Sequence, residues 1–121
     1  MDELLGRLVA KVGVDRVAAE KAVAIILDFL RKEGPADKVQ ALIDKLPGAE
    51  ALLQSMAASA GGGMFGMGGI MGAGTKMMAA GLSMGQVQAV TREVIGFARE
   101  KAGEDAVGEV VGAIPGLGQF V

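Results

Sequence analysis

Methionine is the only reactive side chain that is concentrated in this sequence, because most residues that carry enzyme chemistry are missing. The chain contains no Cys, His, Trp or Tyr. Their absence removes the usual zinc ligands, thiol nucleophiles, the most common general base and the Ser-His-Asp triad. Seven of the eight methionines fall between positions 56 and 84. We therefore expect a protein that is not an enzyme and that holds no metal and no cofactor.

The methionine-rich segment could have one of several roles. Its thioethers could bind monovalent copper, but no Cys or His accompanies them, and methionine commonly fills apolar gaps. By default the segment is an apolar linker. Exposed apolar side chains on a glycine-rich backbone could also adapt to a protein partner or to a second copy of the chain. The candidate partner-binding residues are Met64, Phe65, Met67, Ile70 and Met71.

A membrane-associated or apolar-ligand-binding role is the alternative for the same segment. Residues 51–75 contain no charge, and 25 residues exceed the length needed to span a bilayer. Eight of them are glycine, however, and only eight are Leu, Ile, Phe or Met. A helix of that composition has low helix propensity and low lipid affinity. Membrane association is therefore possible but not favoured.

The sequence does not support a phosphate-binding loop, an acid/base pair or a nucleic-acid-binding surface. Residues 69–76 contain Gly, Thr and Lys without the spacing of a phosphate-binding loop, and no strand precedes them. Glu104 and Asp105 are adjacent, so on a helix they would not face each other as an acid/base pair. The net charge is −2, which provides no positive field for nucleic acid.

The chain contains an internal repeat. A shift of 68 residues aligns 13–53 with 81–121 without a gap, and seven of the 41 pairs are identical. Other pairs preserve the role of the position. They are the N-caps Asp15/Ser83 and the apolar pairs Ile26/Val94, Leu27/Ile95, Leu42/Val110, Ile43/Val111, Leu46/Ile114, Leu52/Phe120 and Leu53/Val121. The identical pairs are Gly13/Gly81, Phe29/Phe97, Arg31/Arg99, Asp37/Asp105, Val39/Val107, Pro47/Pro115 and Gly48/Gly116.

Each repeat predicts a long helix followed by a short one. The first long helix should begin after the N-cap Asp15 and end near Glu33, before Gly34-Pro35. Its counterpart should begin at Ser83, where Gln86 completes a capping box, and end near residues 102–103. The short helices carry apolar residues at helical spacing. These residues are Val39, Leu42, Ile43 and Leu46 in one copy, and Val107, Val110, Val111 and Ile114 in the other.

The elements together predict an all-α fold. A short leading helix should carry Leu4, Leu5, Leu8, Val9 and Val12. Behind it, two homologous helical hairpins should pack as one pseudo-symmetric bundle, and no sheet is expected. We expect a single domain over 1–121, with a first repeat at 1–54, a Met/Gly-rich linker at 55–75 and a second repeat at 76–121.

Both halves close with a Leu/Ile-Pro-Gly stop after a short amphipathic helix, at residues 46–48 and 114–116. With the N-capped, Ala-rich long helices, this pattern resembles small bacterial proteins of unknown function, notably the VcgC/VcgE-like and YidB-like groups. The resemblance covers both repeats. It implies an all-helical fold, and those groups have no agreed biochemical activity, so it transfers no functional residue.

The acidic start and the absence of cysteine favour a cytoplasmic location, since a secretory signal needs a basic first region. The functional hypothesis is a non-catalytic bacterial protein that binds another protein or itself.

Overall fold

The chain is helical throughout the part that the structure describes. A computed structural model describes residues 2–46, 48–60, 75–114 and 117–119, and none of these lies in a strand. Residues 75–79 form one further helical turn and a half between α4 and α6. The other elements are α1 (Asp2–Lys11), α2 (Arg16–Glu33), α3 (Ala36–Asp44), α4 (Ala49–Ala60), α6 (Met84–Ala102), α7 (Glu104–Ala113) and the 3-10 helix η1 (Leu117–Gln119).

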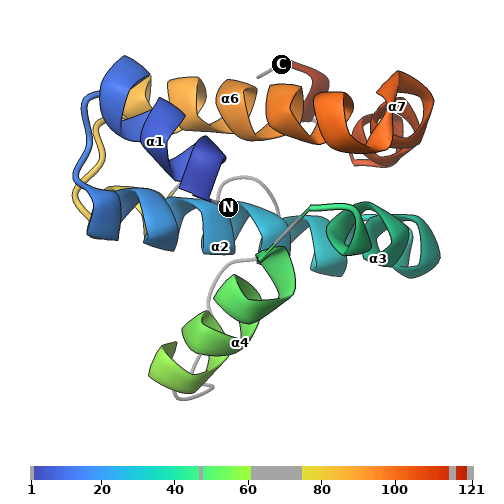
Figure 1. Cartoon of the computed structure of the whole chain (residues 1–121), viewed down its shortest axis with the longest axis horizontal. Helices are drawn as coiled ribbons and strands as arrows, with labels where there is room; N and C mark the ends of the chain where they lie inside the picture. Colours follow the sequence, from blue (N-terminus) through green and yellow to red (C-terminus); the bar gives the residue numbers. More distant parts are fainter. Residues whose placement is uncertain (1, 47, 61–74, 115–116, 120–121) are drawn as a thin grey trace.

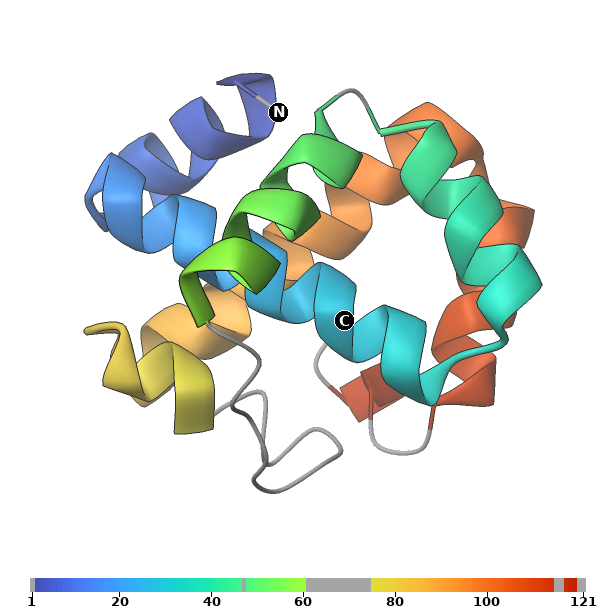
Figure 2. The same ribbon diagram turned by 90° about the horizontal axis from the view of Figure 1, so that it is seen from below.

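The two long helices lie one above the other. Figure 1 shows α6 above α2 and α4 below it, so α2 is the middle layer. At one end α3 lies beside α7, and Lys38 of α3 forms an ion pair with Glu109 of α7. The turns at 12–15 and 80–83 both lie at the opposite end (Figures 1 and 2).

Helix α2 forms the centre of the hydrophobic core. Six consecutive residues, 22–27, are buried, which covers every direction around a helix with 3.6 residues per turn. This burial is possible because α2 contacts α1, α3, α4 and α6.

The leading helix α1 joins the two halves. It contacts both α2 and α6, and buries Leu4, Leu5 and Leu8 at helical spacing. The chain then turns at Gly13, whose φ of +84° is a left-handed conformation that glycine adopts without steric cost. The aligned Gly81 has a φ of +105° and ends the 75–79 helix in the same conformational region.

The two long helices begin differently. The Ser83 side chain accepts a hydrogen bond from the backbone N–H of Gln86 at 3.2 Å, and the Gln86 side chain accepts one from the backbone N–H of Ser83 at 2.9 Å. The predicted capping box is therefore confirmed. Asp15 is the N-cap residue of α2 as expected, but its side chain makes no capping hydrogen bond. In α2, Ala18 occupies the position of Gln86 in α6. Its side chain has no oxygen that could accept a hydrogen bond from the backbone N–H of Asp15.

A close approach between α2 and α3 requires a glycine at position 34. Helix α2 ends at Glu33 as predicted, and the Gly34 N–H donates to the Leu30 carbonyl oxygen at 2.9 Å. A Cβ at this position would lie 2.9 Å from that oxygen and 2.9 Å from a methyl carbon of Val39. Glycine is thus required here by space, not by its φ.

The predicted linker is shorter than expected. Helix α4 runs to Ala60, so residues 55–60 continue a helix across the boundary that the sequence places after residue 54. Residues 75–79 are also helical. The physical reason is composition, because α4 consists mainly of Ala, Leu, Met, Gln and Glu, which have high helix propensity. The remainder of the predicted linker, 61–74, lies outside the described residues.

Many aligned positions in the two halves share their burial. Six residues at helical spacing in α2 are buried, and so are the six residues aligned with them in α6. They are Ala19, Ala22, Val23, Ile26, Phe29 and Leu30, and Val87, Val90, Thr91, Val94, Phe97 and Ala98. The short helices and the residues that flank them follow the same pattern. The buried pairs include Val14/Leu82, Ala19/Val87, Ala22/Val90, Ile26/Val94, Leu27/Ile95, Phe29/Phe97, Val39/Val107, Leu42/Val110, Leu46/Ile114 and Ala49/Leu117.

Removal of the Ser83 side chain should cost more stability than removal of the Asp15 side chain. We expect Ser83→Ala to lower the free energy of unfolding by about 0.5–2 kcal/mol, because both bonds of the capping box are lost. Asp15→Ala is the matched control at the aligned position and should change it by less than about 0.5 kcal/mol. Urea denaturation followed by circular dichroism measures both. Equal losses would contradict this assignment.

Alanine should have opposite effects at Gly34 and at Gly96. Gly34→Ala should destabilise the fold by about 1–3 kcal/mol, because the added methyl group collides with neighbouring atoms. Gly96 lies inside α6 with no atom within 4 Å of a built Cβ. Gly96→Ala should stabilise the fold by about 0.5–1 kcal/mol, because alanine has the higher helix propensity. The shift of the urea midpoint has opposite sign in the two variants if the packing is as described.

Candidate interaction surface

The five partner-binding residues predicted from the sequence lie outside the described residues. They are Met64, Phe65, Met67, Ile70 and Met71, all within 61–74. The described chain ends before this segment at α4 and resumes with the helix at 75–79.

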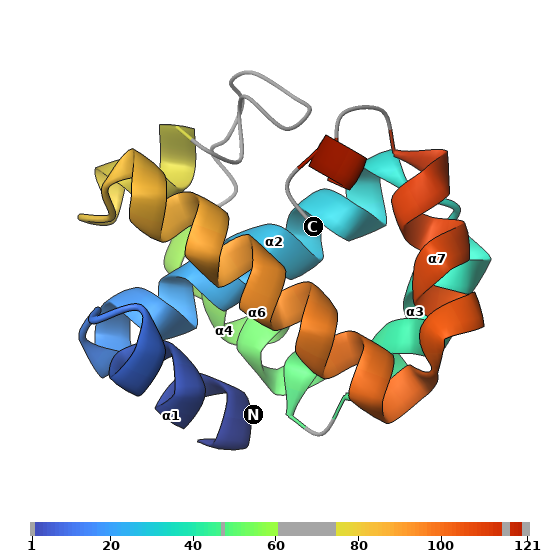
Figure 3. The same ribbon diagram turned by 90° about the horizontal axis from the view of Figure 1, so that it is seen from above.

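The described part of the chain exposes a separate set of large apolar side chains. Val9 is 41% exposed, Val17 61%, Met78 47% and Met84 58%. Each lies within three residues of the 12–15 turn or the 80–83 turn, and both turns lie at the same end of the molecule (Figure 3). We call these four residues the turn-end surface. The sequence predicts Val9 in the leading helix, but it does not predict exposed apolar residues near the two turns.

The turns are anchored by other residues. Val14 and Leu82, one in each turn, are buried in the core, and so is Met77 beside the exposed Met78. Successive helical residues point about 100° apart, so one side chain packs inward while its neighbour faces solvent. The turn-end residues are therefore not needed to close the core. Complete burial of such a side chain contributes about 1.5–3 kcal/mol, so burial of the exposed half against a partner would contribute about half of that.

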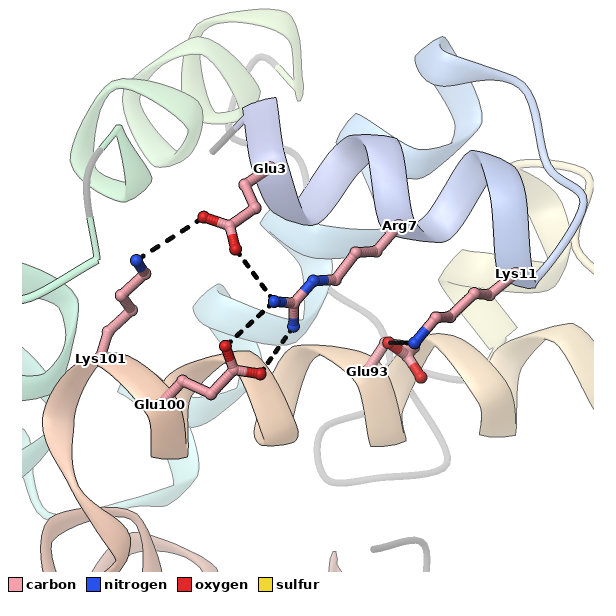
Figure 4. A network of polar contacts seen from close by, with 6 residues as sticks. All are labelled: Glu3, Arg7, Lys11, Glu93, Glu100 and Lys101. Carbon is pink, nitrogen blue, oxygen red and sulfur yellow. Dashed lines mark hydrogen bonds and ion pairs between the residues drawn. The ribbon is translucent and has the colours of Figure 1, made fainter.

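A polar network covers the contact between α1 and α6, as Figure 4 shows. Arg7 of α1 donates two hydrogen bonds to the Glu100 carboxylate of α6, at 2.7 and 3.0 Å. It donates a third to Glu3, at 2.9 Å. The guanidinium carbon lies 5.6 Å from the centroid of the buried Phe97 ring, and the Lys101 ammonium lies 5.4 Å from it. These distances are within the range of cation–π contacts.

The network is built to position a helix. The Arg7 guanidinium is divided between two carboxylates, so it is not available to an anionic ligand. Its hydrogen bonds hold the pKa of the Glu100 carboxyl below the ordinary value, against the opposing effect of desolvation, and the bond to Glu100 raises the pKa of Arg7. Glu3 and Arg7 stand four residues apart, a spacing that indicates a helical ion pair. The hydrogen bonds between Arg7 and Glu100 join residues far apart in the sequence, so no spacing in the sequence predicts them.

The other candidate carboxylates form no shared site. Asp28 pairs with Lys32 of its own helix at 3.1 Å, while Glu104 and Asp105 occupy the first turn of α7, where a negative charge complements the helix dipole. Within the described ranges, no group of three or more His, Cys, Asp or Glu residues could hold a metal ion. Among the helices of these same ranges, none combines the length and the apolarity needed to cross a bilayer.

Comparisons with known proteins identify no relative. No protein-family model matches the chain, and no curated protein or solved structure matches it significantly.

The contact between Glu100 and Arg7 should make stability depend on pH. Because the folded-state pKa of Glu100 is lowered from 4.5, its contribution is complete above that value and is lost as the pH falls through the folded pKa. Glu100→Gln should therefore reduce the loss of Tm between neutral and acidic pH. Asp105→Asn is a control in which this pairing is intact. Parallel Tm–pH curves for Glu100→Gln and the wild type would exclude the coupling.

Proposed function

We propose that this chain is a non-catalytic bacterial module for protein–protein interaction or self-assembly, and that it is cytoplasmic. The observation that carries the proposal is the turn-end surface. Four large apolar side chains face solvent around two turns at one end of the molecule. Exposed apolar surface that is contiguous commonly marks a site where a protein binds another.

The bundle that presents this surface is, in our proposal, a single domain of two homologous hairpins, α2–α3 and α6–α7, related by pseudo-symmetry. Three observations support it: the repeat in the sequence, the shared burial of aligned positions, and the contacts α2–α6 and α3–α7. A pseudo-twofold axis would bring equivalent helices together in this way. The resemblance to the VcgC/VcgE-like and YidB-like groups belongs to the same proposal.

The sequence extends the apolar character of the turn-end surface along the chain. Met71, the last of the partner-binding residues predicted from the sequence, stands only seven residues before Met78. Between them are two glycines, an alanine and a threonine, with a lysine and Met77 immediately before Met78. The predicted patch and the turn-end surface are thus two candidate parts of one association site, and they can be tested separately.

Light scattering over a range of concentrations tests self-assembly. The wild type should form oligomers, and Val17→Ser/Met78→Ser/Met84→Ser should weaken their affinity by at least about tenfold. A tenfold change is about 1.4 kcal/mol, which is less than the burial of three half-exposed apolar side chains contributes together. Gln88→Ser, at an exposed position of α6, should leave assembly unchanged. Circular dichroism shows that each variant is folded.

The second set of variants replaces Met64, Phe65, Met67 and Ile70 with Ser. Loss of oligomers here as well would place the predicted patch in the same contact. A wild type that stays monomeric at all concentrations would contradict self-assembly. Salt-resistant recovery of the protein in the membrane fraction would instead favour the membrane-associated alternative predicted from the sequence.

A further inference from the structure

Two thioethers of the turn-end surface are accessible to solvent, and a third beside them is not. Met78 is 47% exposed and Met84 is 58% exposed, whereas Met77 is 3% exposed. Accessible methionine is oxidised to the sulfoxide, which replaces a flexible apolar side chain with a polar one. The chain has no cysteine, so no thiol of this protein would compete for an oxidant.

Oxidation at these two positions would alter the surface and spare the core. Met77 belongs to the hydrophobic core cluster, so an oxidant reaches its sulfur only when this part of the chain opens. Met84 is the first residue of α6 and faces solvent, and Met78 also points away from the core. A polar oxygen on either side chain can therefore be solvated without any rearrangement of the fold.

We propose that Met78 and Met84 form a modification site for peroxide-class oxidants, and that their oxidation switches off the association described above. The second part rests on the proposed function. In the reaction the sulfur lone pair attacks one oxygen of hydrogen peroxide. An S–O bond forms, the O–O bond breaks, and the departing hydroxide takes the proton of the new S–OH group, which gives the sulfoxide and water. The sulfur is oxidised by two electrons and the peroxide is reduced. Sulfoxide reductases reverse the change.

The site is tested by the rates of oxidation of individual methionines in the folded protein. After timed exposure to hydrogen peroxide, peptide mass spectrometry measures the fraction of each methionine that has gained one oxygen. We expect Met78 and Met84 to be oxidised at least about tenfold faster than Met77, because only Met77 requires local opening. In denaturant the three rates should converge. Equal rates in the folded protein would overturn the modification site.

The switch is tested with variants that separate oxidation from apolarity. Met78→Leu/Met84→Leu keeps an apolar surface without an oxidisable sulfur, so its oligomers should persist in peroxide while those of the wild type dissociate. Met78→Gln/Met84→Gln introduces polarity and should weaken association by at least about tenfold without any oxidant. Met77→Leu, the control in the core, should respond to peroxide like the wild type.

The two proposals fail in different ways. If the leucine variant loses its oligomers in peroxide as the wild type does, the switch lies elsewhere and this part is overturned, although self-assembly stands. If the wild type never associates, the switch fails together with the proposed function. The oxidation rates still decide whether Met78 and Met84 are a modification site.

Discussion

The burial of α2 on nearly every side is the constraint on which the rest of this structure depends. Residues 22–27 are all buried, so apolar surface must reach this helix from several directions. Helices α6 and α4 supply it from opposite faces, while α1 and α3 close the remaining sides. A ten-residue helix such as α1 has little stability alone, and it persists here because it buries three leucines in this arrangement.

The same constraint explains where the two halves differ. Ala24 and Ile25 of α2 are buried, but the aligned residues of α6 are Arg92 and Glu93. Helix α4 packs on α2, whereas its counterpart in the second half is described only as the 3-10 helix η1, which contacts α7. Helix α6 therefore keeps a polar face, and on that face Glu93 meets Lys11 of α1 at 3.9 Å. One long helix is central and the other remains partly at the surface.

Local patterns in the sequence predicted the helices well and the tertiary polar contacts poorly. Period, capping and stop signals placed both long helices, because these signals act between residues close in sequence. Helix α4 is not among the predicted helices, because the uncharged segment 51–75 indicated a linker although residues 49–60 have high helix propensity. The bond between Arg7 and Glu100 joins residues 93 positions apart, so it became visible only when the packing of α1 on α6 was known. Of the candidate association site, the sequence pointed to residues 61–74 but not to the turns.

The two turns separate the apolar residues that folding needs from those that it does not need. Folding needs an apolar anchor in each turn, and Val14 and Leu82 provide it by entering the core. Val17 and Met84, each in the first turn of its helix, face solvent. A polar residue at either position would be compatible with the helix and would leave the packing of the core unchanged. Stability thus explains the buried members of each turn but not the apolar character of their exposed neighbours. The proposed contact with a partner would take these side chains out of water.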